Sequence, residues 1–225
     1  MCPRARGIVT HDHPLGRTRS RSRTSYTPLP GSRLDLREIP TKRRIPRLFG
    51  YATSVPLDII GCMSGELRVG YPETARDLAM MRLALEEAIQ AAEEGEVPVG
   101  AVVVRGEEVL AAAHNKRETS KDPTAHAELL ALRHAAKKLG RWRLADCTLY
   151  STLEPCPMCA GALHAARVGR LVYAAPDPKA GAAGTLYDLP TDSRLNHTYP
   201  YTSGTLREEA ATLLHAFFKQ CRSKE

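Results

Sequence analysis

Apolar residues recur at intervals of three and four through residues 73–95. They are Leu78, Met81, Leu85, Ala88, Ile89 and Ala92. This spacing predicts an amphipathic helix that ends at Gly95. The apolar run at 97–105 predicts a buried strand, and a Gly-Glu-Glu turn leads into a second strand at 109–115. We expect these two strands to form a hairpin.

The second half of the pattern alternates helices with strands. Asp122-Pro123-Thr124 predicts a helix start, because a capping residue precedes proline in the first turn, and this helix is expected to run to about Gly140. Strands are predicted at 147–153 and 170–175, with a helix that begins near Pro155 between them. A short extended piece within 196–204 and an amphipathic helix over 205–221 complete the chain. Such alternation indicates an α/β layered fold.

Residues 1–70 differ from the rest, because they are rich in Arg, Ser and Pro and have no sustained apolar period. We therefore expect two parts, a basic and disordered extension over 1–70 and a folded domain over 71–225. The extension could be a tail that contacts RNA, an organelle transit segment, or the product of an upstream start codon with Met63 as the true start.

Charge follows the same division. The chain has 32 Lys and Arg against 25 Asp and Glu, but residues 1–50 hold 12 of the basic and 3 of the acidic residues, which leaves 20 basic and 22 acidic residues elsewhere. Nucleic-acid binding by the folded part would therefore need a local basic patch. No apolar run is long enough to span a bilayer, and the six scattered cysteines do not suggest a disulfide framework. We expect a cytoplasmic protein, or a plastid or other organellar one if the extension is a transit peptide.

Two short motifs carry the candidate chemistry. His126 and Glu128 lie two residues apart at one predicted helix start, and Cys156 and Cys159 lie three apart at another. One imidazole and two thiolates suit a zinc ion with a fourth position left open for water, and zinc lowers the pKa of such a water towards neutrality. Glu128 could then move protons beside the metal without binding it. Together the motifs match the H-x-E…P-C-x-x-C signature of zinc deaminases.

Each motif taken alone has a simpler interpretation. A single His at a helix start is usually a surface or capping residue, and a single Glu there usually interacts with the helix dipole. A C-x-x-C pair could be a redox pair or half of a structural zinc site. A structural site would need four protein ligands, and a redox pair would not explain the His126-x-Glu128 motif, so the combination favours a catalytic metal site.

Several stretches resemble the bacterial-type tRNA-specific adenosine deaminases, within the zinc-dependent cytidine and deoxycytidylate deaminase superfamily. They are EVPVGAVVV, HNKRETSKDPTAHAELLALR, LYSTLEPCPMCAGAL, DPKAGAAGTLYDL, LNH and the terminal FF, and the resemblance covers roughly residues 78–224. It implies a three-layer α/β/α cytidine-deaminase-like fold with a central mixed sheet of about five strands. It implies one zinc ion per subunit with His126, Cys156 and Cys159 as ligands, Glu128 as proton shuttle and Asn115 as a substrate-binding residue.

The resemblance also implies an activity and partners. The activity is hydrolytic conversion of adenosine to inosine at the wobble position of a tRNA anticodon, by a homodimer with the anticodon stem-loop as substrate and without a membrane partner. Six basic residues could contact phosphates: Arg117, Lys121, Arg170, Lys179, Lys219 and Arg222. The alternatives are a zinc-dependent deaminase of a free base or nucleoside, of guanine or cytidine type, and a zinc-stabilised scaffold without activity. Glu128 argues against the scaffold, because a structural zinc site does not need it.

Overall fold

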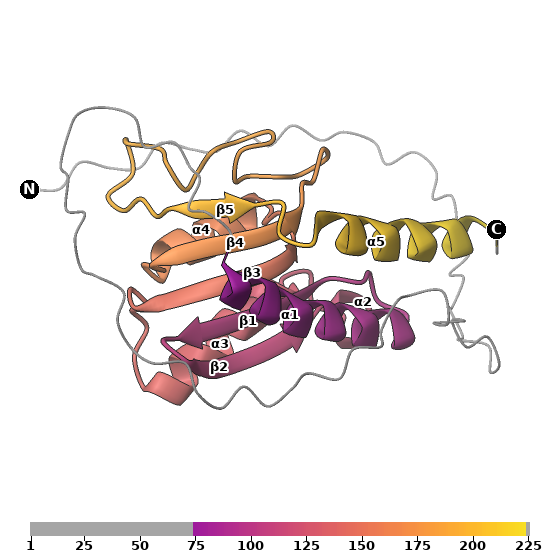
Figure 1. The fold of residues 1–225 in the computed structure, drawn as a ribbon, viewed down its shortest axis with the longest axis horizontal. Coiled ribbons are helices and arrows are strands. Elements are labelled where there is room, and N and C mark those ends of the chain that lie inside the picture. Colours follow the sequence, from indigo (N-terminus) through magenta and orange to yellow (C-terminus); the bar gives the residue numbers. More distant parts are fainter. Residues whose placement is uncertain (1–73, 224–225) are drawn as a thin grey trace, which may run out of the picture. The chain divides into compact units, whose positions relative to one another are not determined.

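The computed structural model describes residues 74–223, so the extension predicted over 1–70 lies outside the described residues. Five strands form one sheet in the order β2-β1-β3-β4-β5 (Figure 1). In chain order they are β1 (Gly100–Arg105), β2 (Glu108–His114), β3 (Cys147–Leu153), β4 (Arg170–Ala175) and β5 (Tyr201–Ser203).

The sheet is mixed, as predicted. β1 pairs antiparallel with both β2 and β3, which confirms the expected hairpin. β3 and β4 run parallel, as do β4 and β5. The register between β1 and β2 shifts between Val103 and Val104, where the hairpin contains a bulge or irregularity. Because β3 and β4 are parallel, the segments that follow them leave the same end of the sheet.

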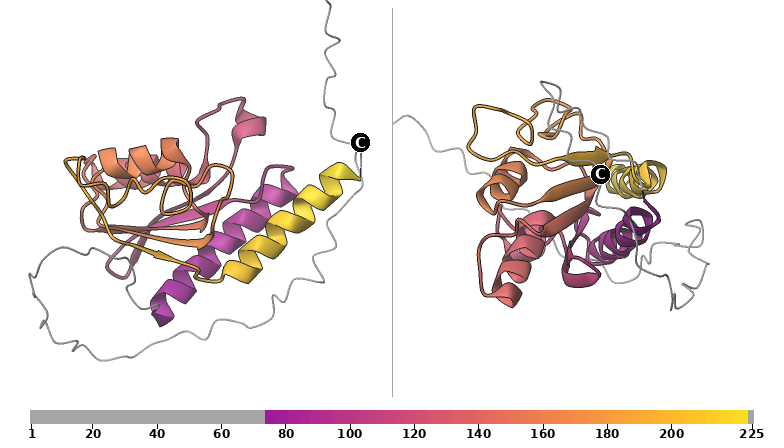
Figure 2. Two further views of the ribbon diagram at one scale, coloured as in Figure 1. Left: turned by 90° about the horizontal axis from the view of Figure 1, so that it is seen from above. Right: turned by 60° about the vertical axis from the view of Figure 1, so that its left-hand side comes forward.

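Helices cover both faces of the sheet, so the predicted three layers are present. α1 (Ala75–Glu93) and α5 (Arg207–Arg222) lie on one face, and α3 (Ala127–Leu139) and α4 (Pro157–Ala165) lie on the other (Figure 2). Strand side chains alternate between the two layers. Val102 and Val172 pack with α1 and α5 in one apolar cluster, whereas neighbouring strand positions join α3 and α4 in a larger cluster.

α1 begins with a complete capping box. The Thr74 hydroxyl accepts from Asp77 N, and the Asp77 carboxylate accepts from Thr74 N, so two of the unpaired amides at the helix start are satisfied. α1 also approaches β1 very closely at Gly100, where a Cβ atom would lie 2.0 Å from Ala84 O. Only glycine permits this backbone contact.

Asp77 ties α1 to the sheet from within the apolar layer. Its carboxylate accepts from both Arg170 NH groups at 3.0 and 3.1 Å and from Tyr150 Oη at 2.8 Å. Burial tends to raise the pKa of Asp77, but the hydrogen bonds outweigh this effect and the pKa lies below its ordinary value. The Arg170 guanidinium is thus paired with a buried carboxylate, and its contact with phosphates stays a prediction.

The start predicted at Asp122-Pro123-Thr124 for the helix that ends near Gly140 is wrong. α3 begins at Ala127, with His126 as its N-cap in extended conformation, and it ends at Gly140, whose φ is 64°. Asp122 instead closes a turn, because its Oδ1 accepts from both Thr124 N and Thr124 Oγ1. A short helix that the pattern did not predict, α2 (Arg117–Ser120), lies between β2 and this turn.

α5 confirms the predicted final helix, with differences at Leu206 and Phe218. Ala210 and Leu213 are buried against the sheet, but Phe218 is 43% exposed. Leu206, which lies inside the helix predicted over 205–221, is instead the N-cap residue, with a φ of 54°. None of the described helices has the length and apolar character needed to cross a membrane.

Candidate metal centre

His126 stands where an irregular segment turns into α3. The backbone fixes it on both sides, because His126 N donates to Thr124 O and its carbonyl accepts from Leu130 N. Lys116 N donates to Ala125 O at 3.0 Å, which ties the end of β2 to the residue before His126. The His126 ring makes no capping hydrogen bond to α3, so its nitrogens are available for other groups.

The two cysteines occupy the corresponding position on α4. Cys156 is the N-cap residue, Pro157 takes the first helical position, and Cys159 is buried in the first turn. Proline suits this position because the first amides of a helix have no internal partner. The start of a helix carries partial positive charge, which stabilises thiolates. This segment follows β3 and lies at the same end of the sheet as the start of α3.

His126, Cys156 and Cys159 converge on one point. Their candidate donor atoms all lie within 4.8 Å of one another. The Nδ1 atom of His126 lies 3.8 Å from Cys156 Sγ and 3.5 Å from Cys159 Sγ. Ligand atoms at ordinary zinc bond lengths in a tetrahedral site are about 3.6–3.8 Å apart. The donor set therefore fits a zinc ion in both chemistry and spacing.

The pKa values of these groups are shifted because the groups share protons with one another. The hydrogen bond from Cys159 is the main cause that lowers the pKa of Cys156 to about 4, and His126 acts in the same direction. The same contact raises the pKa of Cys159, and burial raises it further. The pKa of His126 is raised, chiefly by its hydrogen bond with Cys156. A bound cation would replace these shared protons.

Glu128 lies beside this donor set. It is 4% exposed, and its carboxylate interacts with the Cys159 thiol. Burial raises the pKa of Glu128 to about 7, although the nearby His126 partly opposes this. A carboxyl group with a pKa near neutrality can both accept and return a proton at physiological pH.

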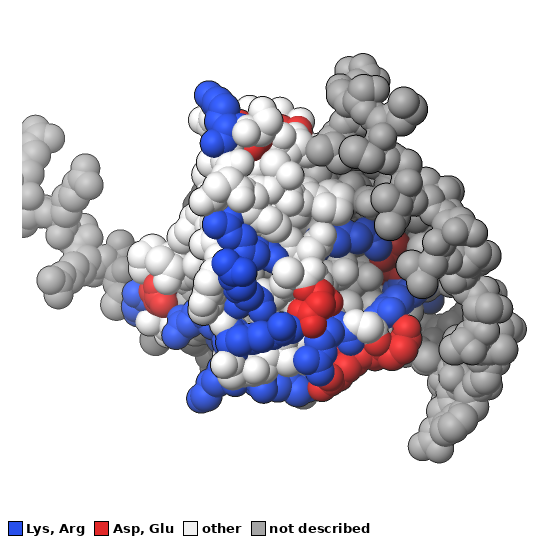
Figure 3. All heavy atoms as spheres, turned by 90° about the vertical axis from the view of Figure 1, so that its left-hand side faces the viewer, with Lys and Arg blue, Asp and Glu red and all other residues white. Residues whose placement is uncertain are grey.

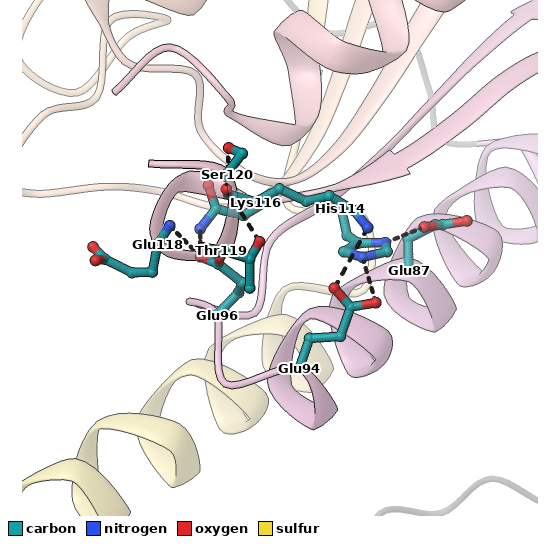
Figure 4. A network of polar contacts seen from close by, with 9 residues as sticks. Glu87, Glu94, Glu96, His114, Lys116, Glu118, Thr119 and Ser120 are labelled. Atoms are coloured by element: carbon teal, nitrogen blue, oxygen red, sulfur yellow. Dashed lines mark hydrogen bonds and ion pairs between the residues drawn. The ribbon is translucent and has the colours of Figure 1, made fainter. Parts of the chain in front are cut away.

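Asn115 is the remaining residue predicted for the site. It lies just before Lys116, the N-cap residue of α2, and is 7% exposed. Its backbone N donates to Val99 O. Its side-chain Nδ2 donates to the Glu96 carboxylate at 3.0 Å. Glu96 could not be recognised as a site residue from the sequence, because a Glu in the acidic stretch after the first helix resembles a surface charge. Figure 4 shows that it instead reaches in under α2.

Glu154 is a second buried carboxylate that the sequence analysis missed. It precedes Pro155-Cys156, is 1% exposed, and accepts from three backbone amides of the following loop, those of Asp177, Ala183 and Thr185. Thr185 Oγ1 also donates to it. Gly181 packs so closely on Glu154 that a Cβ atom would lie 2.3 Å from Oε2. The loop over 177–185 is therefore built around this side chain, immediately next to the cysteines.

Basic side chains are distributed unevenly over the described surface. Figure 3 shows many Lys and Arg side chains and few acidic ones on the face that forms the left-hand side of Figure 1. Of the predicted phosphate contacts, the five besides Arg170 are exposed: Arg117, Lys121, Lys179, Lys219 and Arg222. Arg117 and Lys121 flank or begin the short α2, next to Asn115.

Comparison with known proteins agrees with this geometry. The MafB19-like deaminase family matches residues 75–222. The tRNA-specific adenosine deaminase of Bacillus subtilis (strain 168) is 50% identical over 150 residues, which are 67% of this chain and 93% of that protein. The protein of the same name from Haemophilus influenzae is 46% identical over 150 residues, which are 66% of this chain and 87% of that protein.

Solved structures give the same result. A chain from a study of A-to-I editing by tRNA:A34 deaminases at the wobble position is 43% identical, with a TM-score of 0.59, over 60% of this chain and 99% of that one. A guanine deaminase from Nitrosomonas europaea is 27% identical, with a TM-score of 0.55, over 70% of this chain and 98% of that one. The fold, the sequence motifs and these relatives agree that the chain belongs to the MafB19-like deaminase family and, within it, to the tRNA-specific adenosine deaminases.

Proposed function

We propose that this protein converts adenosine to inosine at the wobble position of a tRNA anticodon by hydrolytic deamination. The observation that carries the proposal is the 50% identity to a tRNA-specific adenosine deaminase across 93% of that protein's length. The likeness to a guanine deaminase extends to the fold but is much weaker in sequence, at 27% identity. The reaction consumes one water molecule and releases one molecule of ammonia.

We assign the metal site to one zinc ion per subunit, held by His126, Cys156 and Cys159. The support is the donor set itself, one imidazole and two thiols whose spacing suits tetrahedral zinc. Zinc bound there supplies a Lewis acid that makes water nucleophilic near neutral pH. The segments that hold the ligands are ordered by backbone contacts at the starts of α3 and α4.

Glu128 is the residue that moves protons in this proposal. Its carboxylate takes one proton of the attacking water and delivers it to N1 of the purine. It then takes the second proton from the hydroxyl group added at C6 and delivers it to the amino group, which leaves as ammonia. Support comes from its burial beside Cys159, which places a carboxyl group next to the proposed ligands. Asn115 is assigned to binding of the target nucleotide.

The substrate partner is the anticodon stem-loop of a tRNA. A target base must leave its stack to reach a buried Glu128, and this costs least in a single-stranded loop. The exposed Arg117 and Lys121 beside Asn115 are suited to contact the phosphates that flank the target. The homodimer and the cytoplasmic or organellar location implied by the sequence stay predictions.

The proposal is tested by the choice of substrate. Purified protein is incubated with an arginine tRNA anticodon stem-loop and, separately, with free guanine and free cytidine, and the products are separated by chromatography and mass. We expect inosine in the stem-loop and no deamination of the free compounds. Activity on guanine or cytidine with none on the stem-loop would assign the protein to the alternative class.

A further inference from the structure

Glu96 is a buried carboxylate with no part in the metal centre. It lies between α1 and β1 and is 0% exposed. Its Oε2 accepts from Asn115 Nδ2 at 3.0 Å and from Glu118 N at 3.2 Å. Its Oε1 accepts from Thr119 N at 2.6 Å, so both oxygens are used (Figure 4). Burying a carboxylate is costly unless donors compensate it, and here three N–H donors do so.

This contact determines which way the amide of Asn115 faces. The oxygens of Glu96 already accept hydrogen bonds from backbone N–H groups, so towards Asn115 they can act only as acceptors. The Asn115 NH₂ group must therefore face Glu96, and its Oδ1 faces away. Among the described residues no group donates to Asn115 Oδ1, and this oxygen is not one of the buried polar atoms left without a partner. It is therefore accessible to a ligand.

The backbone brings Asn115 close to the segment that carries His126. Lys116 N donates to Ala125 O, so the residue after Asn115 is joined to the residue before His126. Asn115 N donates to Val99 O, which holds the peptide on the other side of Asn115 to the residue just before β1. With its backbone fixed twice and its NH₂ group held by Glu96, Asn115 has little freedom left.

We propose that Glu96 is a positioning residue that fixes Asn115 with its carbonyl oxygen, not its NH₂ group, offered to the substrate. The inference rests on the proposed function and deepens it, because it assigns the polarity of the substrate contact. The ring nitrogens N1, N3 and N7 of adenine only accept hydrogen bonds. Asn115 would therefore bind a donor of the target nucleoside, its ribose hydroxyl or its exocyclic amine.

A double-mutant cycle between the two residues tests this polarity. Asn115→Asp keeps an acceptor for the substrate but sets two carboxylates against each other, so kcat/KM for the stem-loop should fall about ten- to a hundred-fold. In the double variant with Glu96→Gln, the Gln amide donates to one Asp oxygen and the other oxygen faces the substrate. We expect the double variant to recover at least about tenfold over Asn115→Asp.

Single changes serve as controls for the cycle. Glu96→Gln alone keeps one oxygen for Asn115 and Glu118 and loses only Thr119, so its kcat/KM should stay within about tenfold of the parent protein. Asn115→Leu should remain inactive whether Glu or Gln occupies position 96. Failure of Glu96→Gln to restore Asn115→Asp would overturn the proposal, because the substrate would then need the NH₂ group or the two residues would act independently.

A second measurement does not depend on the reaction. In a ¹⁵N–¹H NMR spectrum the side-chain NH₂ protons of Asn115 should exchange slowly with water and should shift in the Glu96→Gln variant. The exposed Asn196, whose Oδ1 accepts from Arg167, provides a fast-exchanging reference. Equal exchange rates for Asn115 and Asn196 would contradict the proposal. If the parent protein makes no inosine while the Asn115 protons are protected, the proposed function fails and the positioning by Glu96 stands.

Discussion

Glu154 offers a direct test of how the loop next to the metal centre is built. Replacing it with Ala leaves the backbone amides of Asp177, Ala183 and Thr185 without their acceptor. The Ala183 amide is buried, and a buried unpaired donor costs about 1–3 kcal/mol. The other two amides can reach water, so each costs about 0.5–1.5 kcal/mol. We therefore expect the free energy of unfolding to fall by about 2–6 kcal/mol.

The Glu154→Gln variant should separate hydrogen bonding from side-chain shape. Its single oxygen can replace Oε1 and accept from the Ala183 and Thr185 amides, while Thr185 Oγ1 can rotate to accept from the new NH₂ group. Among the backbone donors only the Asp177 amide then loses its partner, at a cost of about 1 kcal/mol. With a urea m-value of about 2 kcal/mol/M, the unfolding midpoint should fall by about 0.5 M for Gln and about 1–3 M for Ala.

The assay is urea unfolding followed by circular dichroism, with zinc content and inosine formation measured on the same samples. Glu107→Gln is the matched control, because Glu107 forms an ion pair with Arg76 but its side chain is 94% exposed. Its midpoint should barely change. A Glu154→Ala variant that unfolds at the parent midpoint and keeps full activity would refute the account of this loop.

Three further changes have defined outcomes. Gly100→Ala, whose Cβ would meet Ala84 O, should lower the free energy of unfolding by about 3 kcal/mol or more. Its control is Gly161→Ala, in open space on α4, which should be neutral or slightly stabilising. Equal urea midpoints for the two variants would contradict the close contact at Gly100. Folding lowers the pKa of Asp77, so the ionised Asp77 carboxylate stabilises the fold fully above the unfolded pKa of 3.8, and this stabilisation is lost as the pH falls through the lower folded pKa. The difference in urea midpoint between the parent protein and Asp77→Asn should therefore shrink at low pH. Cys159→Ala should abolish stoichiometric zinc by atomic absorption, and retained zinc would remove Cys159 from the ligand set.

The elements with strong periodicity could be predicted from the sequence, because each has a single apolar face. The amphipathic helix of residues 75–93, the hairpin that follows it and the strands at 147–153 and 170–175 all appear as predicted. The order of the strands could not be read, since local pattern does not say which strand pairs with which. The mixed sheet came from the resemblance.

The start of α3 shows why capping signals mislead. Asp-Pro-Thr suits both a helix N-cap and an Asx turn, since a short carboxylate can accept from the amide two residues on in either case. The structure uses the turn, with Asp122 bonded to Thr124, and gives the cap to His126. The helix start is therefore moved to His126, the proposed ligand, and its side chain faces the cysteines.

The site was predicted in part for a similar reason. His126, Glu128 and the two cysteines form a motif whose chemistry can be recognised in the sequence, and the structure brings His126, Cys156 and Cys159 together. Glu96 and Glu154 were missed because a single Glu in a polar or proline-rich context gives no sign of burial. Their position immediately before an apolar strand and before the Pro-Cys pair was the available signal. Both hold backbone segments beside the site instead of joining it.

The central claim is that Glu128 moves protons at a zinc site without holding the metal. The most direct measurement compares parent and Glu128→Ala proteins for inosine formed in an arginine tRNA anticodon stem-loop and for zinc bound per subunit. The account predicts one zinc per subunit in both proteins and inosine only in the parent. Inosine formation by Glu128→Ala at the parent rate would contradict the claim, and so would loss of zinc together with activity.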